Sequence, residues 1–365
     1  MLVVGSVNID ILIPTPRCPV AGETLVSTSS VPSLTNGRNS LVPGGTGANQ
    51  AVACARLGVK AFLLCRFGND IFADFLRQNI VENQVDLTYS STSASHPSGM
   101  AVVMLFPSGE SSALVLSGSN HDWPEGNIVG SREEEEEVEE KEEEEEEEDD
   151  KRIEDDTIQR SLDSLSRSYS IACIMLQMEI PHHVNMAVIA LASERGIPIF
   201  HDLCGESRVL NVNYLSRCAY LSPNISELSR LTNEMPVNTE EEIIAAAGQL
   251  QQKGARNVLI TRGSEGSLLI TERKTKREEG IEGGFHSKGD GTIVRQVCFP
   301  VEGVVDEAGA GDNFRAAFVV AHYVEGRSVE ESLRFAAASG AVAVGKPGGG
   351  LLIGSTREEI NRLLL

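Results

Sequence analysis

The sequence predicts an α/β fold in which a doubly wound parallel sheet is flanked by helices and carries a small, separate antiparallel sheet. First, short apolar runs bounded by turns alternate with helical patterns, as buried parallel strands alternate with their crossover helices. Second, two glycine-rich clusters each run into a helical pattern, as expected at the carboxyl ends of the strands, where such sheets bind their ligands. Third, two stretches lack the spacing of β-α-β units and therefore predict the second sheet.

The expected elements of the main sheet alternate along the chain. Strands are expected at five apolar runs: residues 1–4, 61–65, 171–176, 198–201 and 257–260. Helices are expected where apolar residues recur with helical spacing: residues 48–56, 72–83, 183–194, 240–253 and 313–324. The glycine clusters should therefore lie at the carboxyl ends of the strands.

The small sheet is expected from residues 11–43 and 96–117. The first stretch holds several prolines among short β-favouring pieces, and residues 98–116 indicate two strands that turn at Pro107-Ser108-Gly109. A detached sheet must bury one of its faces, so pairing of two such sheets is expected. The main α/β domain is assigned the remaining residues: 1–10, 44–95 and 118–365.

A run of acids dominates the net charge. The formal charge is −22, and residues 133–150 hold 16 acids against one Lys, so the rest of the chain carries only −7. Such a run cannot bury apolar surface, and residues 130–156 are expected to be a solvated, low-complexity insert; a partner-binding acidic segment is the alternative. The remainder offers no basic stripe, so nucleic acid is not an expected partner.

Composition indicates a globular protein. With 365 residues, of which 41% are apolar, the chain can hold one large domain with an appendage or two domains. No apolar run approaches the length of a membrane span, so no membrane partner is expected. Seven scattered cysteines without a pairing pattern favour the cytoplasm, or a plastid if a transit segment precedes the chain.

The most informative stretch is Gly309-Ala310-Gly311-Asp312, which runs directly into a helical pattern. Glycines there let backbone N–H groups converge at a helix N-terminus, where the partial positive charge favours an anion. Asp312 is placed to take a proton from a hydroxyl beside that anion. An anion site with a neighbouring base is the least that a phosphotransferase requires. The alternative is a flexible turn with Asp312 as the N-cap.

A second glycine cluster, Gly44-Gly45-Thr46-Gly47-Ala48-Asn49-Gln50, opens an amphipathic helix that stops at Gly58. Neither cluster is a Walker A loop, because no Gly-Lys-Ser/Thr follows at the required spacing. Gly5-Ser6-Val7-Asn8 does not fit the dinucleotide fingerprint either. The sequence therefore excludes these two common modes of phosphate binding.

With three further motifs between these clusters, the chain resembles the ribokinase-like (PfkB) sugar kinases, and within them the plant-type ribokinases. The five motifs follow the family's order: residues 44–50, 177–181, 222–227, 259–266 and 309–312. The resemblance covers nearly the whole chain except about residues 130–156. It implies a doubly wound sheet with a small antiparallel β lid over the sugar, which is often a dimer interface in this family.

The resemblance also implies an activity, which is the ATP-dependent phosphorylation of D-ribose at its primary hydroxyl to ribose 5-phosphate. ATP, Mg²⁺ and a monovalent cation (K⁺) are the implied cofactors. Two alternatives stay open: a related kinase acting on another sugar or a nucleoside, such as fructose or adenosine, and a non-catalytic sugar-binding paralogue.

The resemblance assigns the sugar site and the chemistry. Asp312 is the implied base, and Gly309, Ala310 and Gly311 form the anion hole. The implied sugar-binding residues are Asn8, Asp10, Gly44, Gly45, Thr46, Gly47, Asn49 and Glu179. The alternatives are an Asx turn at Asn8 and Asp10, a capping amide at Asn49 and an exposed strand-end Glu179. Thr46 stands where ribokinases usually have Lys, which puts the choice of sugar in doubt.

The nucleotide and metal sites are implied in the same way. Asn224 and Glu227 are placed near Mg²⁺ and phosphate, with a simple helix start as the alternative. The implied nucleotide-binding residues are Thr261, Arg262, Gly263, Ser264, Glu265, Gly266 and Gly311. Positions that hold K⁺ in ribokinases, mainly through backbone carbonyls, are Asp306, Ala308, Ala343, Lys346 and Gly348. Glu307 and Leu352 depart from the usual Thr and Ser there.

Overall fold

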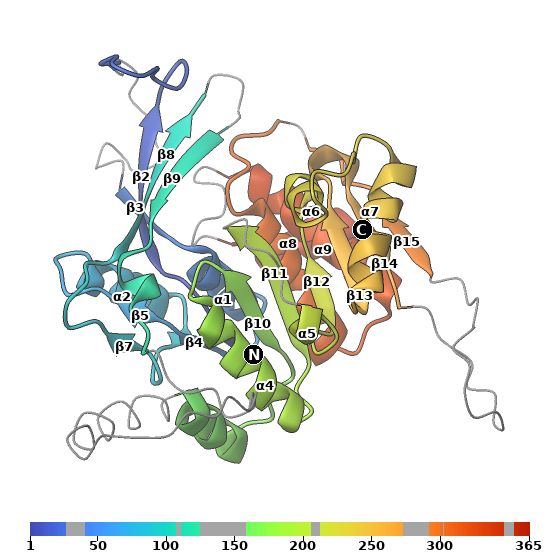
Figure 1. Cartoon of the computed structure of the whole chain (residues 1–365), viewed down its shortest axis with the longest axis horizontal. Coiled ribbons are helices and arrows are strands. Elements are labelled where there is room, and N and C mark those ends of the chain that lie inside the picture. The colour runs from blue at the N-terminus through green and yellow to red at the C-terminus, as the bar shows by residue number, and fades with distance from the viewer. Residues whose placement is uncertain are drawn as a thin grey trace, which may run out of the picture.

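The computed structural model describes residues 1–26, 41–106, 111–124, 158–205, 212–272, 292–301, 303–346 and 354–365. Within these ranges the chain forms a large, mostly parallel sheet with helices packed against it, and a smaller sheet that rises away from it at the upper left of Figure 1. The expected fold class is confirmed.

The large sheet has nine strands in the order β15-β14-β13-β12-β11-β10-β1-β4-β6. Seven strands are mutually parallel: β1 (Leu2–Val4), β4 (Ala61–Leu64), β6 (Val85–Asp86), β10 (Ile174–Met178), β11 (Ile199–Gly205), β12 (Tyr220–Ser222) and β13 (Asn257–Thr261). Two antiparallel strands complete one edge: β14 (Ser267–Ile270) and β15 (Ile293–Gln296). Strands β5 (Arg66–Phe67) and β7 (Ser91–Thr92) form a separate pair.

The helices connect these strands. Their bounds in the described ranges are α1 (Thr46–Arg56), α2 (Ala73–Glu82), α4 (His182–Glu194), α5 (Val212–Leu215), α6 (Ile225–Leu231), α7 (Glu240–Gln252), α8 (Ala310–Val319), α9 (Val329–Val344) and α10 (Arg357–Leu364). A single π-helical turn, Val320–Val324, follows α8.

Alternate residues of each parallel strand enter two different apolar cores, one on each face of the sheet. In β1, Val3 belongs to the core that also contains side chains of α1, α2, α8 and α9, whereas Leu2 and Val4 belong to the core that contains those of α4 and α7. Because both faces are covered by helices, the strands contain few polar residues until their carboxyl ends. Polar side chains gather at those ends, and the site is built there.

The smaller sheet has the order β3-β2-β8-β9, with strands β2 (Asn8–Pro14), β3 (Leu41–Gly44), β8 (Gly99–Leu105) and β9 (Ser111–Leu116). The expected hairpin of β8 and β9 is antiparallel, and its Pro107-Ser108-Gly109 turn lies outside the described residues. The purely antiparallel expectation is wrong in one respect, because β2 and β8 pair in parallel and the sheet is mixed. Strand β2 follows β1 almost directly, so the large sheet sets its direction.

Several expected bounds shift. Strand β10 begins three residues later than predicted, and α8 begins at Ala310, so Asp312 lies inside its first turn. Strand β12 and helices α9 and α10 were not predicted. Both helices begin with a capping box, formed by Ser328 with Glu331 and by Thr356 with Glu359, and this motif can be recognised in a sequence. The acidic residues 133–150 lie outside the described ranges. None of the described helices is long and apolar enough to cross a membrane.

Candidate active site

Asp312 is buried in the first turn of α8, against the start of α1. Its side chain accepts hydrogen bonds from Asn49 Nδ2 at 2.9 Å and from Gln50 Nε2 at 3.1 Å. Burial raises the pKa of Asp312 to about 6, although these hydrogen bonds and the nearby Arg315 oppose the rise. A carboxylate with this pKa is ionised at neutral pH and is a stronger base than an exposed Asp.

The start of α8 leaves backbone donors available. Gly309 is the N-cap with φ 73°, a left-handed conformation that favours glycine, and no side chain caps the helix. The alternative in which Asp312 is the N-cap is therefore wrong. The first N–H groups of a helix have no intrahelical partner, so those of Gly311 and Asp312 are suited to an anion.

The start of α1 approaches the end of β1 closely. A Cβ on Gly47 would lie 2.6 Å from the backbone N of Ser6, so only glycine fits there. Gly45, with φ 92°, turns the chain into the helix. No side chain caps α1, and Asn49 donates to Asp312 instead, so the capping alternative for Asn49 is wrong.

Glu179, at the end of β10, faces the start of α1. Its Oε2 accepts hydrogen bonds from the Thr46 backbone N–H at 3.1 Å and from the Ser6 hydroxyl. The side chain is half-buried, so the alternative of an exposed strand-end Glu is wrong. Glu179 thus supplies negative charge at a helix N-terminus while lying near Asp10 and Asp312, whose pKa values it raises.

Asn8 and Asp10 lie in strand β2 itself, so the Asx-turn alternative is wrong. Asp10 is 6% exposed, and burial, with Glu179 and Asp312 nearby, raises its pKa to about 7. Its Oδ1 is buried and has no hydrogen-bond partner among the described residues. A Cβ on Gly44 would overlap the Asp10 carboxylate. Buried polar atoms are normally hydrogen-bonded, so an unpaired carboxylate oxygen here suits a ligand hydroxyl.

Asn224 and Glu227 form a capping box at the start of α6. Asn224 Oδ1 accepts from the Glu227 N–H at 2.9 Å, and Glu227 Oε2 accepts from the Asn224 N–H at 2.7 Å. The helix-start alternative is thus present in the structure. The second oxygen of Glu227, Oε1, takes no part in the capping box, so a role near a metal stays a prediction.

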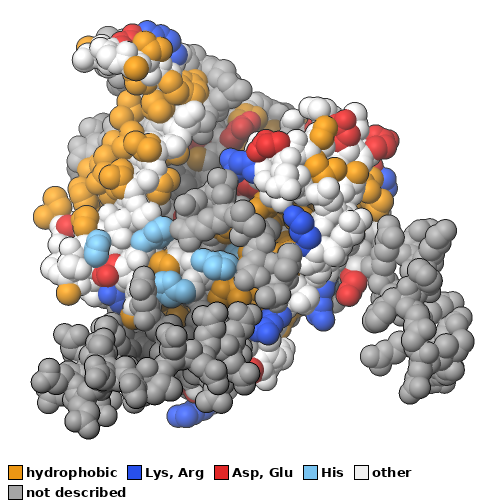
Figure 2. Space-filling view, viewed as in Figure 1, with side chains coloured by type: hydrophobic (Ala, Val, Ile, Leu, Met, Phe, Trp, Pro, Cys, Tyr) orange, Lys and Arg blue, Asp and Glu red, His pale blue; other side chains and the backbone are white. Residues whose placement is uncertain are grey.

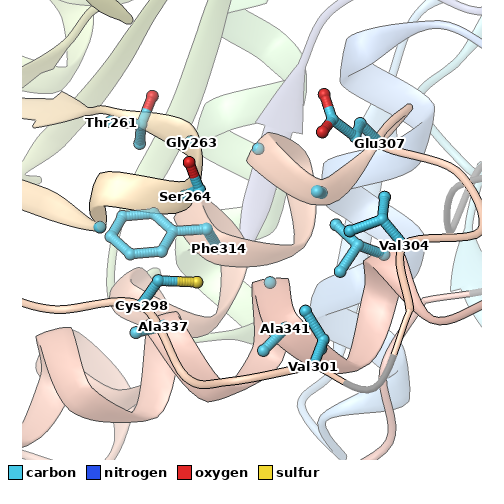
Figure 3. A pocket seen from close by; sticks show the side chains of 15 residues that line it. Thr261, Gly263, Ser264, Cys298, Val301, Val304, Glu307, Phe314, Ala337 and Ala341 are labelled. Atoms are coloured by element: carbon cyan, nitrogen blue, oxygen red, sulfur yellow. The ribbon is translucent and has the colours of Figure 1, made fainter. Parts of the chain in front are cut away.

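A cavity of about 260 Å³ lies beside α8 and α9. Figure 3 shows Thr261, Gly263 and Ser264 on one side of it, and Val304 and Glu307 on the other. Gly266 and Gly311, also predicted, line it as well. Arg262 and Glu265, which were predicted too, are not among the residues that line it; Arg262 Nη1 lies 3.6 Å from Glu265 Oε2.

Much of this cavity's lining was not predicted. The additional residues are Cys298, Val301, Val304, Glu307, Phe314, Ala337, Gly340, Ala341 and Val344, and Ala310, which was predicted as part of the anion hole, also lines the cavity. Those on α9 are small or apolar and recur at helical spacing. This spacing can be recognised in the sequence, but it is equally typical of a helix face packed in a core. Its role as a wall of a cavity depends on the packing of α9 beside α8.

Behind Asp312 lies a buried polar network that the sequence did not predict. Gln50 Nε2 also donates to Asp202 Oδ2 at 2.7 Å, and Gln177 Nε2 donates to Gln50 Oε1 at 2.7 Å. Asp202, fully buried in the middle of β11, has its Oδ1 3.1 Å from Arg315 Nε. The network ties β10 and β11 to the first turn of α8.

Some of the predicted K⁺ positions lie close to one another. Asp306 Oδ1 accepts from the Ala308 N–H at 2.9 Å, and Val344 O accepts from the Asp306 N–H at 3.2 Å. The Lys346 amine donates to Glu359 Oε2 at 2.8 Å and to the Gly354 carbonyl oxygen at 2.9 Å, so a role of Lys346 in holding a cation stays a prediction. Gly348 and Leu352 lie outside the described residues. No cluster of three or more His, Cys, Asp or Glu side chains suited to a metal occurs in the described ranges.

The sequence profile of the pfkB family of carbohydrate kinases matches residues 1–142 and 127–354. The chain belongs to the pfkB family. As a pfkB carbohydrate kinase it shares 32% identity with a ribokinase of Arabidopsis thaliana, over 94% of this chain and 76% of that one. It shares 28% identity with a deoxyribokinase of Salmonella typhi, over 94% and 91%.

The same likeness holds in three dimensions. The structure of Arabidopsis thaliana ribokinase complexed with ribose and ATP superposes on this pfkB kinase with a TM-score of 0.74 and 31% identity, covering 100% of this chain and 97% of that one. The chain therefore has the fold of a carbohydrate kinase family, and the roles of Asp312, the start of α8 and the neighbouring cavity stay predictions.

Proposed function

We propose that this pfkB kinase transfers the γ-phosphoryl group of ATP to the primary hydroxyl of D-ribose. The observation that carries the proposal is the position of Asp312, a buried carboxylate with a raised pKa beside a glycine-lined helix start. The sugar oxygen forms a bond to the γ-phosphorus while the bond to the ADP oxygen breaks. The hydroxyl proton goes to Asp312, and the electron pair of the broken bond leaves with ADP.

The sugar would lie between β2, β10 and the start of α1. Asp10 Oδ1 and Asn49 Oδ1, which are buried without partners among the described residues, would accept hydrogen bonds from sugar hydroxyls. Asn8 Oδ1 accepts from Asn120 Nδ2 at 2.7 Å, which leaves its amide N–H groups for the sugar. Glu179 would hold the start of α1 in place and face the sugar.

ATP would place its base in the 260 Å³ cavity, where Phe314 and the small side chains of α9 offer apolar walls. Its phosphates would point to the N–H groups at the start of α8. Glu227 Oε1, which the capping box does not use, and Asn224 fit a Mg²⁺ that keeps several waters. Bound Mg²⁺ would neutralise phosphate charge. A monovalent cation would be held at Asp306 and Ala308 and on the carbonyls near Ala343.

ADP release from the full chain with ATP and Mg²⁺ tests the proposal. D-Ribose, 2-deoxyribose, fructose, adenosine and buffer alone should be compared in both potassium and sodium buffers. We expect the highest kcat/KM with ribose and a higher rate in potassium. A preference for another acceptor would establish the second candidate, a related sugar kinase, which Thr46 favours. Release no faster than in buffer would indicate a non-catalytic sugar-binding protein.

Thr46→Lys is expected to tighten ribose binding. Thr46 is half-buried, and its N–H donates to Glu179, so a Lys amine there would be close to the carboxylates around the sugar. A charge-assisted hydrogen bond is worth roughly 1.5–3 kcal/mol, so the KM for ribose should fall by about tenfold or more, with kcat changing less. Steady-state kinetics with ribose and fructose check this. Lower activity on ribose without a gain for fructose would show that Thr46 is adapted to another substrate.

We also propose that the smaller sheet of strands β2, β3, β8 and β9, called the lid sheet from here on, pairs with the same sheet of a second copy of the chain. The face opposite Asp10 is mostly apolar. Ile11, Val102 and Leu114 lie in register across three strands, Ile13 pairs with Met104, and Leu116 pairs with Met100, whereas Ser112 is the polar member of this face. Leu114 and Leu116 are 64% and 53% exposed, and hydrophobic side chains cover the upper left of Figure 2, where the lid lies. Exposed apolar patches of this kind are typical of interfaces.

Leu114→Glu should therefore convert a dimer to a monomer, because it places a charge on the exposed part of the apolar face, in the edge strand β9. Light scattering at micromolar concentration measures the change. Val81→Glu, at an exposed apolar residue of α2, is the matched control and should leave the mass unchanged. A monomeric parent protein would contradict the proposal.

A further inference from the structure

Arg315 lies inside the site, on the same face of α8 as the predicted anion hole. It is 5% exposed and comes one helical turn after Gly311. Because helical side chains point back toward the N-terminus, its guanidinium runs alongside the first turn of α8. A Cβ placed on Gly311 would lie 2.7 Å from Arg315 Nη1, so this nitrogen is directly beside the glycine that lines the nucleotide cavity.

The rest of the guanidinium is fixed from the other side. Nε lies 3.1 Å from Asp202 Oδ1 and donates to Ser222 Oγ at 3.1 Å, and Nη2 donates to the Ser222 carbonyl at 3.2 Å. Nη1 takes part in none of these contacts. Two of the three nitrogens thus hold the plane of the group against β11 and the end of β12, and the third is presented to the start of α8.

The surrounding charge explains why a cation is needed here. Burial disfavours the charge on Arg315, but Asp202, Glu227 and Asp312 raise its pKa above the usual value, so the guanidinium stays charged. Glu179 adds further negative charge near Asp312. The transferring phosphoryl group is itself anionic, so the site must offset repulsion from these carboxylates.

We propose that Arg315 is a catalytic residue whose Nη1 contacts the phosphoryl group as it passes from ATP to the acceptor. This inference rests on the proposed kinase function and adds a side-chain donor to the backbone N–H groups of Gly311 and Asp312. As the bond to the acceptor oxygen forms and the bond to the ADP oxygen breaks, charge spreads over the phosphoryl oxygens. A guanidinium held beside them stabilises that charge without having to move into place.

The competing explanation is that Arg315 only neutralises the buried Asp202. Removing Arg315 alone would leave Asp202 unpaired and destabilise the fold, so the comparison is made in an Asp202→Asn background. In that background the double variant contains neither charge of the pair, and in Asp202→Asn alone Arg315 keeps Glu227 and Asp312 as nearby opposite charges. The decisive pair is thus Asp202→Asn against Asp202→Asn with Arg315→Met.

Adding Arg315→Met should lower kcat by about 100-fold or more, since transition-state donors and arginines of phosphotransferases are typically worth that much. It should also lower the affinity for ATP, relative to ADP, by about tenfold in calorimetry with Mg²⁺, because only ATP carries the γ-phosphoryl group. Equal kcat values within about threefold, or an unchanged ratio of ATP to ADP affinity, would overturn the proposal.

Two further comparisons keep the test decisive. Asp163→Asn with Arg195→Met removes a partly exposed Arg–Asp pair, 2.6 Å apart near the end of α4 and away from the site, and should leave kcat within about threefold. If Asp202→Asn with Arg315→Met does not fold, the single variant Arg315→Lys is measured against the parent instead. Lys can pair with Asp202 but cannot also reach Gly311. A kcat loss of less than threefold in this variant would overturn the proposal. If no acceptor is phosphorylated, the proposed function fails, and the calorimetric ratio still decides the role of Arg315.

Discussion

Asp312→Asn is expected to nearly abolish phosphoryl transfer while leaving the fold and ATP affinity unchanged. Asn has the shape of Asp and keeps one oxygen that can accept from either Asn49 or Gln50, which bind different oxygens of Asp312, but it cannot take the hydroxyl proton. Loss of a general base typically costs about 10²–10⁴-fold in rate. Single-turnover kinetics, with ATP affinity measured in parallel, check the prediction. An Asn variant that turns over within about threefold of the parent would show that another group is the base.

The pH profile of the parent protein gives an independent check. Burial raises the pKa of Asp312 to about 6, so the base is ionised at neutral pH and becomes protonated as the pH falls through 6. We expect kcat/KM to fall about tenfold per pH unit below that value, because only the ionised carboxylate accepts the proton. A profile that stays flat down to pH 5 would contradict a base with this pKa.

The sequence was sufficient for the parts of the site that depend on backbone conformation. Gly45 and Gly309 adopt positive φ values where the two clusters turn into helices, and a run of glycines before an apolar helical pattern reports that requirement directly. The main sheet was likewise predictable, because strands covered on both faces are apolar runs of fixed length.

Contacts between distant segments could not be predicted in this way. Asp202 and Arg315 meet only because β11 passes beside the first turn of α8, and neither residue stands in a local pattern that indicates a partner. The parallel pairing of β2 with β8 is a similar case, because alternation of side chains identifies a strand but not the direction of its neighbour. Glu227 is a third case that the sequence alone could not decide. The same Asn-x-x-Glu sequence can form a capping box or place a carboxylate near a metal ion.

Asp10→Asn is expected to raise the KM for the sugar by about 10–100-fold with a smaller effect on kcat. The Asp10 carboxylate is buried, and its Oδ1 has no partner in the described part of the chain, so we infer that a sugar hydroxyl satisfies it. Loss of a charge-assisted hydrogen bond of roughly 1.5–3 kcal/mol accounts for a change of that size. The KM for ATP should not move, since Asp10 lies in the lid strand β2 and not in the nucleotide cavity.

Stability distinguishes this role from a structural one. An unpaired buried carboxylate costs free energy in the sugar-free protein, so Asn, which is neutral, should leave the Tm unchanged or raise it. Asp86→Asn, which removes an exposed partner of Lys60, is the matched control and should alter neither KM. If Asp10→Asn instead lowered the Tm and raised both KM values together, Asp10 would be supporting the lid and not binding the sugar. A selective rise in the sugar KM with an intact Tm follows only if the carboxylate itself contacts the substrate.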